Sequence, residues 1–303
     1  MRPRSNSKWT VYAISVFSII LWGMSYIWSD QLLRLEISVF YIVCIRSLVA
    51  GLVLLGFNLL WGNSLRIRKE DLPKFVFLSF CEPFIYFVCE TYGIKLTESP
   101  TYSALVIATA PVFSVMAGIL LFKEKINGVN ILGIIICLAG LFLVTHEATS
   151  VGEHFSAGVL MLFVAVLSEV GYASVTKALS KRYKPTVIVQ YQFLIGAVIL
   201  FPLMGTLGMK RYDASLYLSW TVWKPLLCLS VLCSGIAFTL WASTIKNLGV
   251  ARASIFLAII PVVTALIGAV LGTELLSLFQ WTGIGISIMG LVLTQYVLKK
   301  NRS

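Results

Sequence analysis

The stretch SALVIATAPVFSVMAGILLFKE, residues 103–124, is repeated in pattern by ASIFLAIIPVVTALIGAVLGTE, residues 253–274. The two stretches are offset by 150 positions, and six residues coincide at that offset. These are Ala108, Pro111, Val112, Gly118, Leu121 and Glu124, which match Ala258, Pro261, Val262, Gly268, Leu271 and Glu274. The segments that follow continue the match, with Gly133 and Gly140 answered by Gly283 and Gly290. We therefore predict two related units, residues 1–147 and 148–303.

The composition is that of an integral membrane protein. The chain has 303 residues, of which 58% are hydrophobic and 12% charged, and its mean hydropathy is +0.91. A helix needs about 20 apolar residues to cross the hydrocarbon of a bilayer, and runs of that kind recur along the whole sequence. Ten of them lie near residues 9–29, 38–61, 74–94, 101–122, 128–146, 156–177, 186–207, 225–245, 252–273 and 280–298.

The number of spans in each unit determines the predicted topology. Five spans are an odd number, so the second unit enters the membrane in the opposite orientation to the first. We therefore predict an all-α integral membrane protein with ten transmembrane helices arranged as two inverted five-helix repeats. Two similar halves of opposite orientation suit a carrier that opens alternately to each side of the membrane.

The placement of basic residues explains the formal net charge of +11. If the N-terminus lies inside, 18 of the 24 Lys and Arg residues fall in inside segments and five in outside segments. This bias follows the positive-inside rule, with both termini in the cytoplasm. It predicts a multi-pass protein of the cytoplasmic (plasma) membrane and argues against nucleic acid as a partner.

No motif in the sequence supports catalysis, a cofactor or a metal site. The six cysteines all fall within predicted spans, and the two histidines lack an HExxH spacing. Phosphate-binding glycine patterns, Walker sequences and GxSxG are also missing from the sequence. We therefore expect a protein that is not an enzyme, and transport without nucleotide hydrolysis.

Four ionisable residues lie inside predicted spans: Arg46, Glu82, Glu90 and Glu169. Such a group costs roughly 2.5 to 3.5 kcal/mol at the centre of a membrane helix, so its presence indicates a function. Glu82, Tyr86 and Glu90 recur at every fourth position and share one helix face, which predicts a cavity wall. Arg46 is deep enough in span two to reach either glutamate. The alternative is an Arg46 to glutamate pair that only fixes helix packing.

Aromatic residues form similar stripes on other spans. Trp22 and Tyr26 lie on span one, Tyr172 follows Glu169 on span six, and Trp241 lies on span eight. Aromatic rings beside carboxylates can hold an ammonium group by charge attraction and by cation–π contact. The alternatives are lipid or interface packing for Trp22 and Tyr26, and for Glu169 an interaction with Lys177 or a lipid headgroup.

The matched prolines Pro111 and Pro261 are predicted to interrupt spans four and nine. A proline in mid-helix removes one backbone hydrogen bond and kinks the helix. Interrupted spans at corresponding positions of two repeats indicate a transport site, although membrane helices also tolerate proline for structural reasons.

The chain resembles the EamA-type transporters of the drug/metabolite transporter superfamily. The resemblance rests on ILWGMSYI in span one, on Arg46, and on two long segments, YGIKLTESPTYSALVIATAPVFSVMAGILLFKEKINGVNILGIIICLAGLFLV and WASTIKNLGVARASIFLAIIPVVTALIGAVLGTELLSLFQWTGIGISIMGLVLT. It implies a ten-helix carrier of small metabolites, often an exporter of amino acids. The resemblance also implies a central cavity lined by spans one, three, four, six, eight and nine. The glutamates at positions 82, 90 and 169 depart from the looser family pattern.

These observations predict a secondary active transporter that exports amino-acid-like or amine compounds. Its expected partners are a small-molecule substrate, the lipid bilayer and, as a candidate coupling ion, the proton. Glu82 is the predicted proton carrier and Glu90 the predicted substrate contact. An anion or nucleotide-sugar exchanger and a non-transporting membrane scaffold remain as alternatives, and the chain is a monomer or a homodimer.

Overall fold

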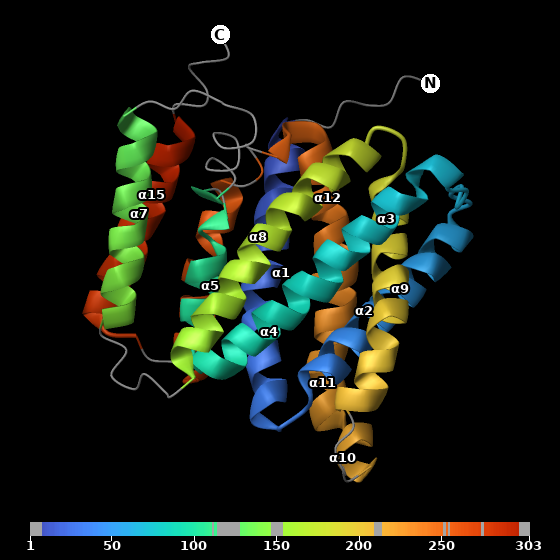
Figure 1. Ribbon diagram of the computed structural model, residues 1–303, viewed down its shortest axis with the longest axis horizontal. Coiled ribbons are helices and arrows are strands. Elements are labelled where there is room, and N and C mark those ends of the chain that lie inside the picture. Colours follow the sequence, from blue (N-terminus) through green and yellow to red (C-terminus); the bar gives the residue numbers. More distant parts are fainter. Residues whose placement is uncertain are drawn as a thin grey trace.

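The computed structural model describes residues 8–110, 112–113, 128–146, 154–208, 214–250, 253, 255–273 and 276–296, and all elements within these residues are helical (Figure 1). By length and composition, six helical segments in this part of the chain can cross a membrane. They are Trp9–Arg34, Val39–Leu60, Lys69–Thr97, Phe155–Leu179, Pro185–Thr206 and Trp220–Leu248. The chain is therefore an all-α membrane protein.

The first half of the chain contributes α1 (Lys8–Arg34), α2 (Val39–Leu60), η1 (Lys69–Asp71), α3 (Leu72–Ser79), η2 (Phe80–Ile85), α4 (Tyr86–Thr97), α5 (Pro100–Ile107) and α7 (Gly128–His146). The second half contributes α8 (Phe155–Leu179), α9 (Pro185–Leu203), η3 (Met204–Gly208), α10 (Ala214–Leu218), α11 (Trp220–Leu227), η4 (Cys228–Ala237), α12 (Phe238–Leu248), η5 (Ile255–Ile259), α14 (Ile260–Leu271) and α15 (Leu278–Tyr296). Each of the ten predicted spans thus contains helix, while Pro111 lies outside the described residues.

The bundle has the polarity of a membrane protein. Large apolar side chains point outward, as with Leu60 at 82% and Val270 at 85% exposure, whereas Ser47 and Thr264 are fully buried. The Ser47 hydroxyl donates a hydrogen bond to the carbonyl of Val43, and the Thr264 hydroxyl donates to that of Ile260. These two buried hydroxyls are thus paired with the backbone of their own helices. Small polar residues at helix contacts are typical of membrane bundles, because lipid leaves only packing and hydrogen bonds to hold helices together.

The predicted third span is not one continuous α-helix. Between α3 and α4 lies η2, a π-helical segment in which Glu82 has non-helical angles, with φ −147° and ψ 120°. Pro83 accounts for this interruption, because it lacks the N–H needed for the helical ladder and forces the preceding residue toward extended angles. The chain therefore breaks its helix in the middle of the span, at the position of a buried carboxyl group.

A second π-helical segment, η4, interrupts the predicted eighth span. Shifted by the repeat offset, η2 corresponds to residues 230–235, which lie within η4. Segments of π-helix are rare and are frequently found at functional sites. The two halves therefore share this irregularity at equivalent positions, whereas a further π-helical segment, η3, corresponds to residues 54–58 within the regular helix α2.

Helices α7 and α15 lie side by side at one edge of the bundle (Figure 1) and pack antiparallel. A Cβ added to Gly140 would lie 2.6 Å from the carbonyl oxygen of Gly283, and one added to Gly290 would lie 2.7 Å from that of Gly133. Only glycine permits this approach. Exchanging the halves by the repeat offset converts the first contact into the second.

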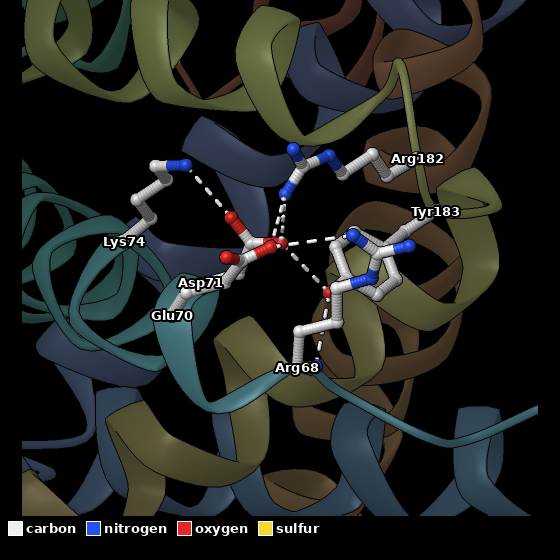
Figure 2. Close-up of polar contacts among 6 residues, drawn as sticks. All are labelled: Arg68, Glu70, Asp71, Lys74, Arg182 and Tyr183. Atoms are coloured by element: carbon white, nitrogen blue, oxygen red, sulfur yellow. Dashed lines mark hydrogen bonds and ion pairs between the residues drawn. The ribbon is translucent and has the colours of Figure 1, made fainter.

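A charged cluster joins the segment before α3 to the turn between α8 and α9 (Figure 2). Asp71 is 1% exposed, and its carboxylate accepts hydrogen bonds from Lys74 (2.7 Å), Arg182 (3.1 Å) and the Tyr183 hydroxyl (2.9 Å). Arg182 also donates to Glu70 at 2.8 Å. We call the end of the bundle that carries this cluster the Asp71 face.

Asp71→Asn is expected to destabilise the folded protein, because it removes the negative charge that three donors share. Glu70→Gln is the matched control, since the Glu70 side chain is 60% exposed and its ion pairs are solvated. The melting temperature of the detergent-solubilised protein should fall by several degrees for Asp71→Asn and stay near that of the wild type for Glu70→Gln. Equal melting temperatures for both variants would contradict a structural role for the buried carboxylate.

Candidate functional site

A single cavity in the centre of the bundle gathers most of the residues expected to form a site. It is lined by Trp22, Ser25, Tyr26, Arg46, Glu82, Tyr86, Phe87, Glu90, Ile107, Glu169, Phe238, Leu257 and Ile260. The lining comes from the predicted first, third, fourth, sixth, eighth and ninth spans, and from the second through Arg46. The cavity volume is about 20 Å³, which is room for about one water molecule.

Arg46 carries the positive charge of the cavity and is 2% exposed. Its guanidinium carbon lies 3.8 Å from the centroid of the Phe87 ring, and its Nε donates to the hydroxyl of Ser234 at 2.6 Å. In the described part of the chain it forms no ion pair with a carboxylate. Arg46 instead shares the cavity with the three glutamates without a direct ion pair to any of them among the described residues.

The three glutamates have different surroundings. Glu90 accepts a hydrogen bond from the Tyr86 hydroxyl at 3.2 Å, one helical turn away on α4. Glu82 is 1% exposed, and its Oε2 has no hydrogen-bond partner among the described residues. Glu169 reaches the same cavity from α8. Lys177, its alternative partner, instead donates to the backbone carbonyls of Ile245 and Lys246, both at 3.1 Å.

Trp22 and Tyr26 both face the cavity rather than lipid. Tyr26 is 2% exposed, and the indole N–H of Trp22 donates to the carbonyl of Cys233 in η4 at 3.3 Å. The structure thus places both on the site side of α1.

Phe238 is the centre of an aromatic cluster that borders the cavity. Its ring centroid lies 4.9 Å from that of Trp22, 5.6 Å from Phe87 and 5.9 Å from Tyr172. Trp241 stacks edge-on with Trp22 at 5.1 Å. Tyr172 and Trp241 therefore stand behind the cavity lining, in contact with rings that form it.

Sequence reasoning missed Phe87 and Phe238. The 18 phenylalanines of this apolar chain are mostly indistinguishable by pattern. Phe87 could have been predicted, because it lies in the helical turn between Tyr86 and Glu90, which were both expected to line a cavity. For Phe238 there was no such signal.

Pro261 lies in the first turn of α14, directly after the 3-10 segment η5, rather than in the middle of a helix. Its missing N–H costs little there, because the first turn has no internal partner for it. The span still changes helix type at this point, and Leu257 and Ile260 on either side of the change line the cavity. The other predicted kink, Pro111, lies outside the described residues.

The cavity combines three carboxyl groups with one guanidinium and several aromatic faces. Carboxylates and ring faces attract ammonium groups, while the guanidinium is a ligand for carboxylates. No group of three or more potential metal ligands occurs among the described residues. The chemistry available is therefore the reversible binding of charged groups in an apolar bundle.

The cavity is closed toward the Asp71 face by contacts among α1, α8 and α12. The hydroxyls of Ser15 and Thr244 lie 2.9 Å apart, and Lys177 of α8 binds the carbonyls at the end of α12. Ligand pockets usually have volumes of about 300 to 1,000 Å³. A metabolite can occupy this site only after the helices separate.

Comparison with known proteins supports these findings. The solved structure of another protein, titled only "Crystal structure of protein", superposes with a TM-score of 0.73 over 98% of this chain and 100% of that chain, at 18% identity. An uncharacterized transporter of Archaeoglobus fulgidus is 24% identical over 97% of this chain and 99% of its own length. The uncharacterized transporter YetK of Bacillus subtilis is 24% identical over 88% of this chain and 81% of its own length.

The model of the EamA-like transporter family matches the chain twice, at residues 9–146 and 156–296. These matches cover most of the chain and agree with the resemblance identified from the sequence. They identify the protein as a transporter rather than an enzyme. The chain belongs to the EamA-like transporter family.

Proposed function

We propose that this protein is a secondary active transporter that carries small amino-acid-like or amine metabolites out across the cytoplasmic membrane. The observation that carries the proposal is the convergence of Glu82, Glu90 and Glu169 with Arg46 on one closed central cavity. Burying ionisable side chains in a membrane bundle costs free energy. Their gathering around one cavity therefore supports the binding of a common ligand there.

The charge balance of the cavity favours a substrate with an ammonium group. Three carboxyl groups face one guanidinium, and the rings of Trp22 and Tyr26 add cation-binding faces. Arg46, held by Ser234 and Phe87, offers a partner for the carboxylate of a zwitterion. An anion or nucleotide-sugar exchanger would need a basic excess here, and a non-transporting scaffold would need no charged cavity.

Alternating access between two inverted five-helix repeats, residues 1–147 and 148–303, is the proposed mechanism. Three observations support it. The cavity is too small for a metabolite in the present conformation. The π-helical segments occupy equivalent positions in the two halves, and the α7–α15 contacts map onto each other when the halves are exchanged. Interrupted helices at matching positions of inverted repeats mark transport sites.

Proton coupling through Glu82 is part of the proposal. Its carboxyl group lies at the break in η2, and one oxygen lacks a hydrogen-bond partner in the described part of the chain. The Arg46 guanidinium lines the same cavity, so movement of one group relative to the other would change the charge that the Glu82 carboxyl group meets.

Both termini are proposed to lie in the cytoplasm. The Asp71 face carries Arg68, Lys74 and Arg182 in one cluster (Figure 2). Basic residues concentrate in cytoplasmic loops, which assigns this face to the cytoplasm.

Counterflow in proteoliposomes, with a panel of amino acids, amines, nucleosides and sugars, tests the substrate class. We expect exchange of an amino acid or amine, and a loss of at least about tenfold for Glu90→Gln, because removing a charged partner from a buried site costs about 1.5–3 kcal/mol. Glu98→Gln is the control, since Glu98 is exposed and ends the same helix. Exchange of anions alone, or equal rates in both variants, would refute the assignment.

Transport driven by a pH gradient tests the role of Glu82. Glu82→Gln mimics the protonated acid, so this variant should retain counterflow of the substrate and lose concentrative transport under a pH gradient. The wild-type protein and Glu98→Gln should show both activities. Gradient-driven transport at the wild-type rate in Glu82→Gln would remove Glu82 from the coupling mechanism.

Labelling with a membrane-impermeant maleimide tests the orientation. Cysteine introduced by Glu36→Cys, between α1 and α2, should react in intact cells, whereas Lys181→Cys, on the Asp71 face, should react only after permeabilisation. The wild-type chain controls for the six native cysteines, all of them buried or half-buried. Labelling of Lys181→Cys in intact cells would reverse the proposed topology.

A further inference from the structure

We propose that Tyr172 and Thr176 form a hydrated proton route along α8, separate from the substrate path, that connects Glu82 and Glu169 to the Asp71 face. This inference rests on the proton coupling proposed above and identifies how the proton reaches the carboxyl groups while the cavity is closed to metabolites.

The first observation is a strip of buried hydroxyls without partners. Tyr172 and Thr176 are both 0% exposed. Their Oη and Oγ1 atoms make no hydrogen bond of good geometry with the described residues, and the side chains of Tyr172 and Thr176 are near enough to interact with each other. A buried polar group left unpaired costs about 1–3 kcal/mol, and buried water normally satisfies such groups where several lie close together. Spaced four residues apart, these two hydroxyls share one face of the helix.

The strip begins at the carboxyl groups of the cavity. Glu169 lies one turn before Tyr172 on α8, so the two side chains share a helix face, and Glu82 lines the same cavity as Glu169. The unpartnered Oε2 of Glu82 adds a further acceptor in the same region. The unpartnered polar atoms therefore run from the break in η2 onto α8.

The strip ends near the Asp71 face. Seven residues separate Glu169 from Thr176, about 10 Å along a helix axis. Thr176 lies one turn before Ser180, the C-cap of α8, and the turn that follows carries Arg182 and Tyr183 of the charged cluster. A proton would thus leave the bundle at the end that we assign to the cytoplasm.

The route is distinct from the path of the substrate. Phe238 lines the cavity and its ring contacts that of Tyr172 edge-on, whereas Tyr172 is not part of the lining. The contact between Ser15 and Thr244 holds α1 against α12 on the same side. Single-file water needs only a row of hydroxyls, whereas a metabolite needs these helices to part.

Other ionisable groups surround the strip. Helices packed against α8 contribute Cys81 and Glu82 of η2, Tyr86 and Glu90 of α4, Lys74 of α3, Tyr102 of α5 and Lys246 of α12. On α8 itself lie Glu169 and Lys177, and the Lys177 ammonium is held by two carbonyls of α12. Tyr86 is bonded to Glu90 and Lys74 to Asp71. The carboxyl groups of Glu82 and Glu169 are thus the proton acceptors that adjoin the strip.

The step involves proton transfer alone. A hydroxyl group can accept a hydrogen bond from one water and donate to the next, so it passes a proton without a net change in itself. A proton delivered from water at the Asp71 face converts the carboxylate of Glu82 or Glu169 into the neutral acid. The reverse transfer returns the proton to the same water phase.

The test measures access to the carboxyl groups without any substrate. A hydrophobic carbodiimide reacts with protonated buried carboxyl groups, and mass spectrometry locates the modified glutamates. Inside-out and right-side-out membrane vesicles receive a pH jump on one face only, followed by a short carbodiimide pulse. In the wild-type protein, modification of Glu82 and Glu169 should follow the pH at the Asp71 face.

The variants Tyr172→Phe and Thr176→Val remove the hydroxyls and keep the side-chain shapes. Each should slow the response to the pH jump by at least about tenfold, while long equilibration at equal pH on both faces restores wild-type modification. That restoration separates lost access from altered acidity or misfolding. Ser174→Ala is the matched control, since it removes an exposed hydroxyl from the same helix, outside the strip.

The proposal fails if both variants respond as fast as the wild type, or if the wild type responds only to the pH at the opposite face. Modification that ignores pH altogether would refute proton coupling and the route together. The substrate assignment is tested separately by counterflow. A wild-type protein without counterflow but with a normal pH response would therefore refute the amine carrier and leave the route intact.

Discussion

The burial of one guanidinium group in an apolar bundle is the constraint on which the rest of the site depends. Removing the Arg46 guanidinium from water is costly unless the protein replaces the lost hydration. The ring of Phe87 and the hydroxyl of Ser234 do so directly. These contacts tie α2 to α4 and to η4. Three carboxyl groups around the same cavity balance the charge at longer range.

The irregular segments η2 and η4 both contribute to this charged centre. In a regular helix the backbone N–H and C=O groups bond to one another along the axis. In η2 that pattern is broken at Glu82, whose carboxyl group lies at the break and next to the cavity. In the other half, η4 supplies Ser234 to Arg46 and the carbonyl of Cys233 to Trp22. The π-helical segments η2 and η4 thus each hold one part of the charged centre.

Much of this arrangement was predictable because helix periodicity determines which side chains share a face. The spacing of Glu82, Tyr86 and Glu90 predicted a cavity wall, and all three line the cavity. The same rule could not show that Tyr172 and Trp241 lie outside the cavity lining. Periodicity places side chains on one helix face, but it does not determine that the rings of Phe238 and Trp22 lie between them and the cavity.

The positions of the helix breaks were predicted less well. Attention to the repeated prolines favoured Pro111 and Pro261 over Pro83, which has no counterpart at the repeat offset. Pro83 breaks its helix because it follows α3 and interrupts the hydrogen bonds of the preceding turns. Pro261 does not break a helix, because it lies in the first turn of α14. Position within the helix therefore matters more than repetition. The antiparallel contact of α7 with α15 was also beyond prediction, since glycine spacing indicates close packing without naming the partner helix.

The α7–α15 contact is symmetric with respect to the two halves of the chain. Gly140 meets Gly283 as Gly290 meets Gly133, so the interface is unchanged when the two halves trade places. An interface with that property can be encoded once. Two glycine positions, each used once in either half, are therefore enough to specify both sides of the contact.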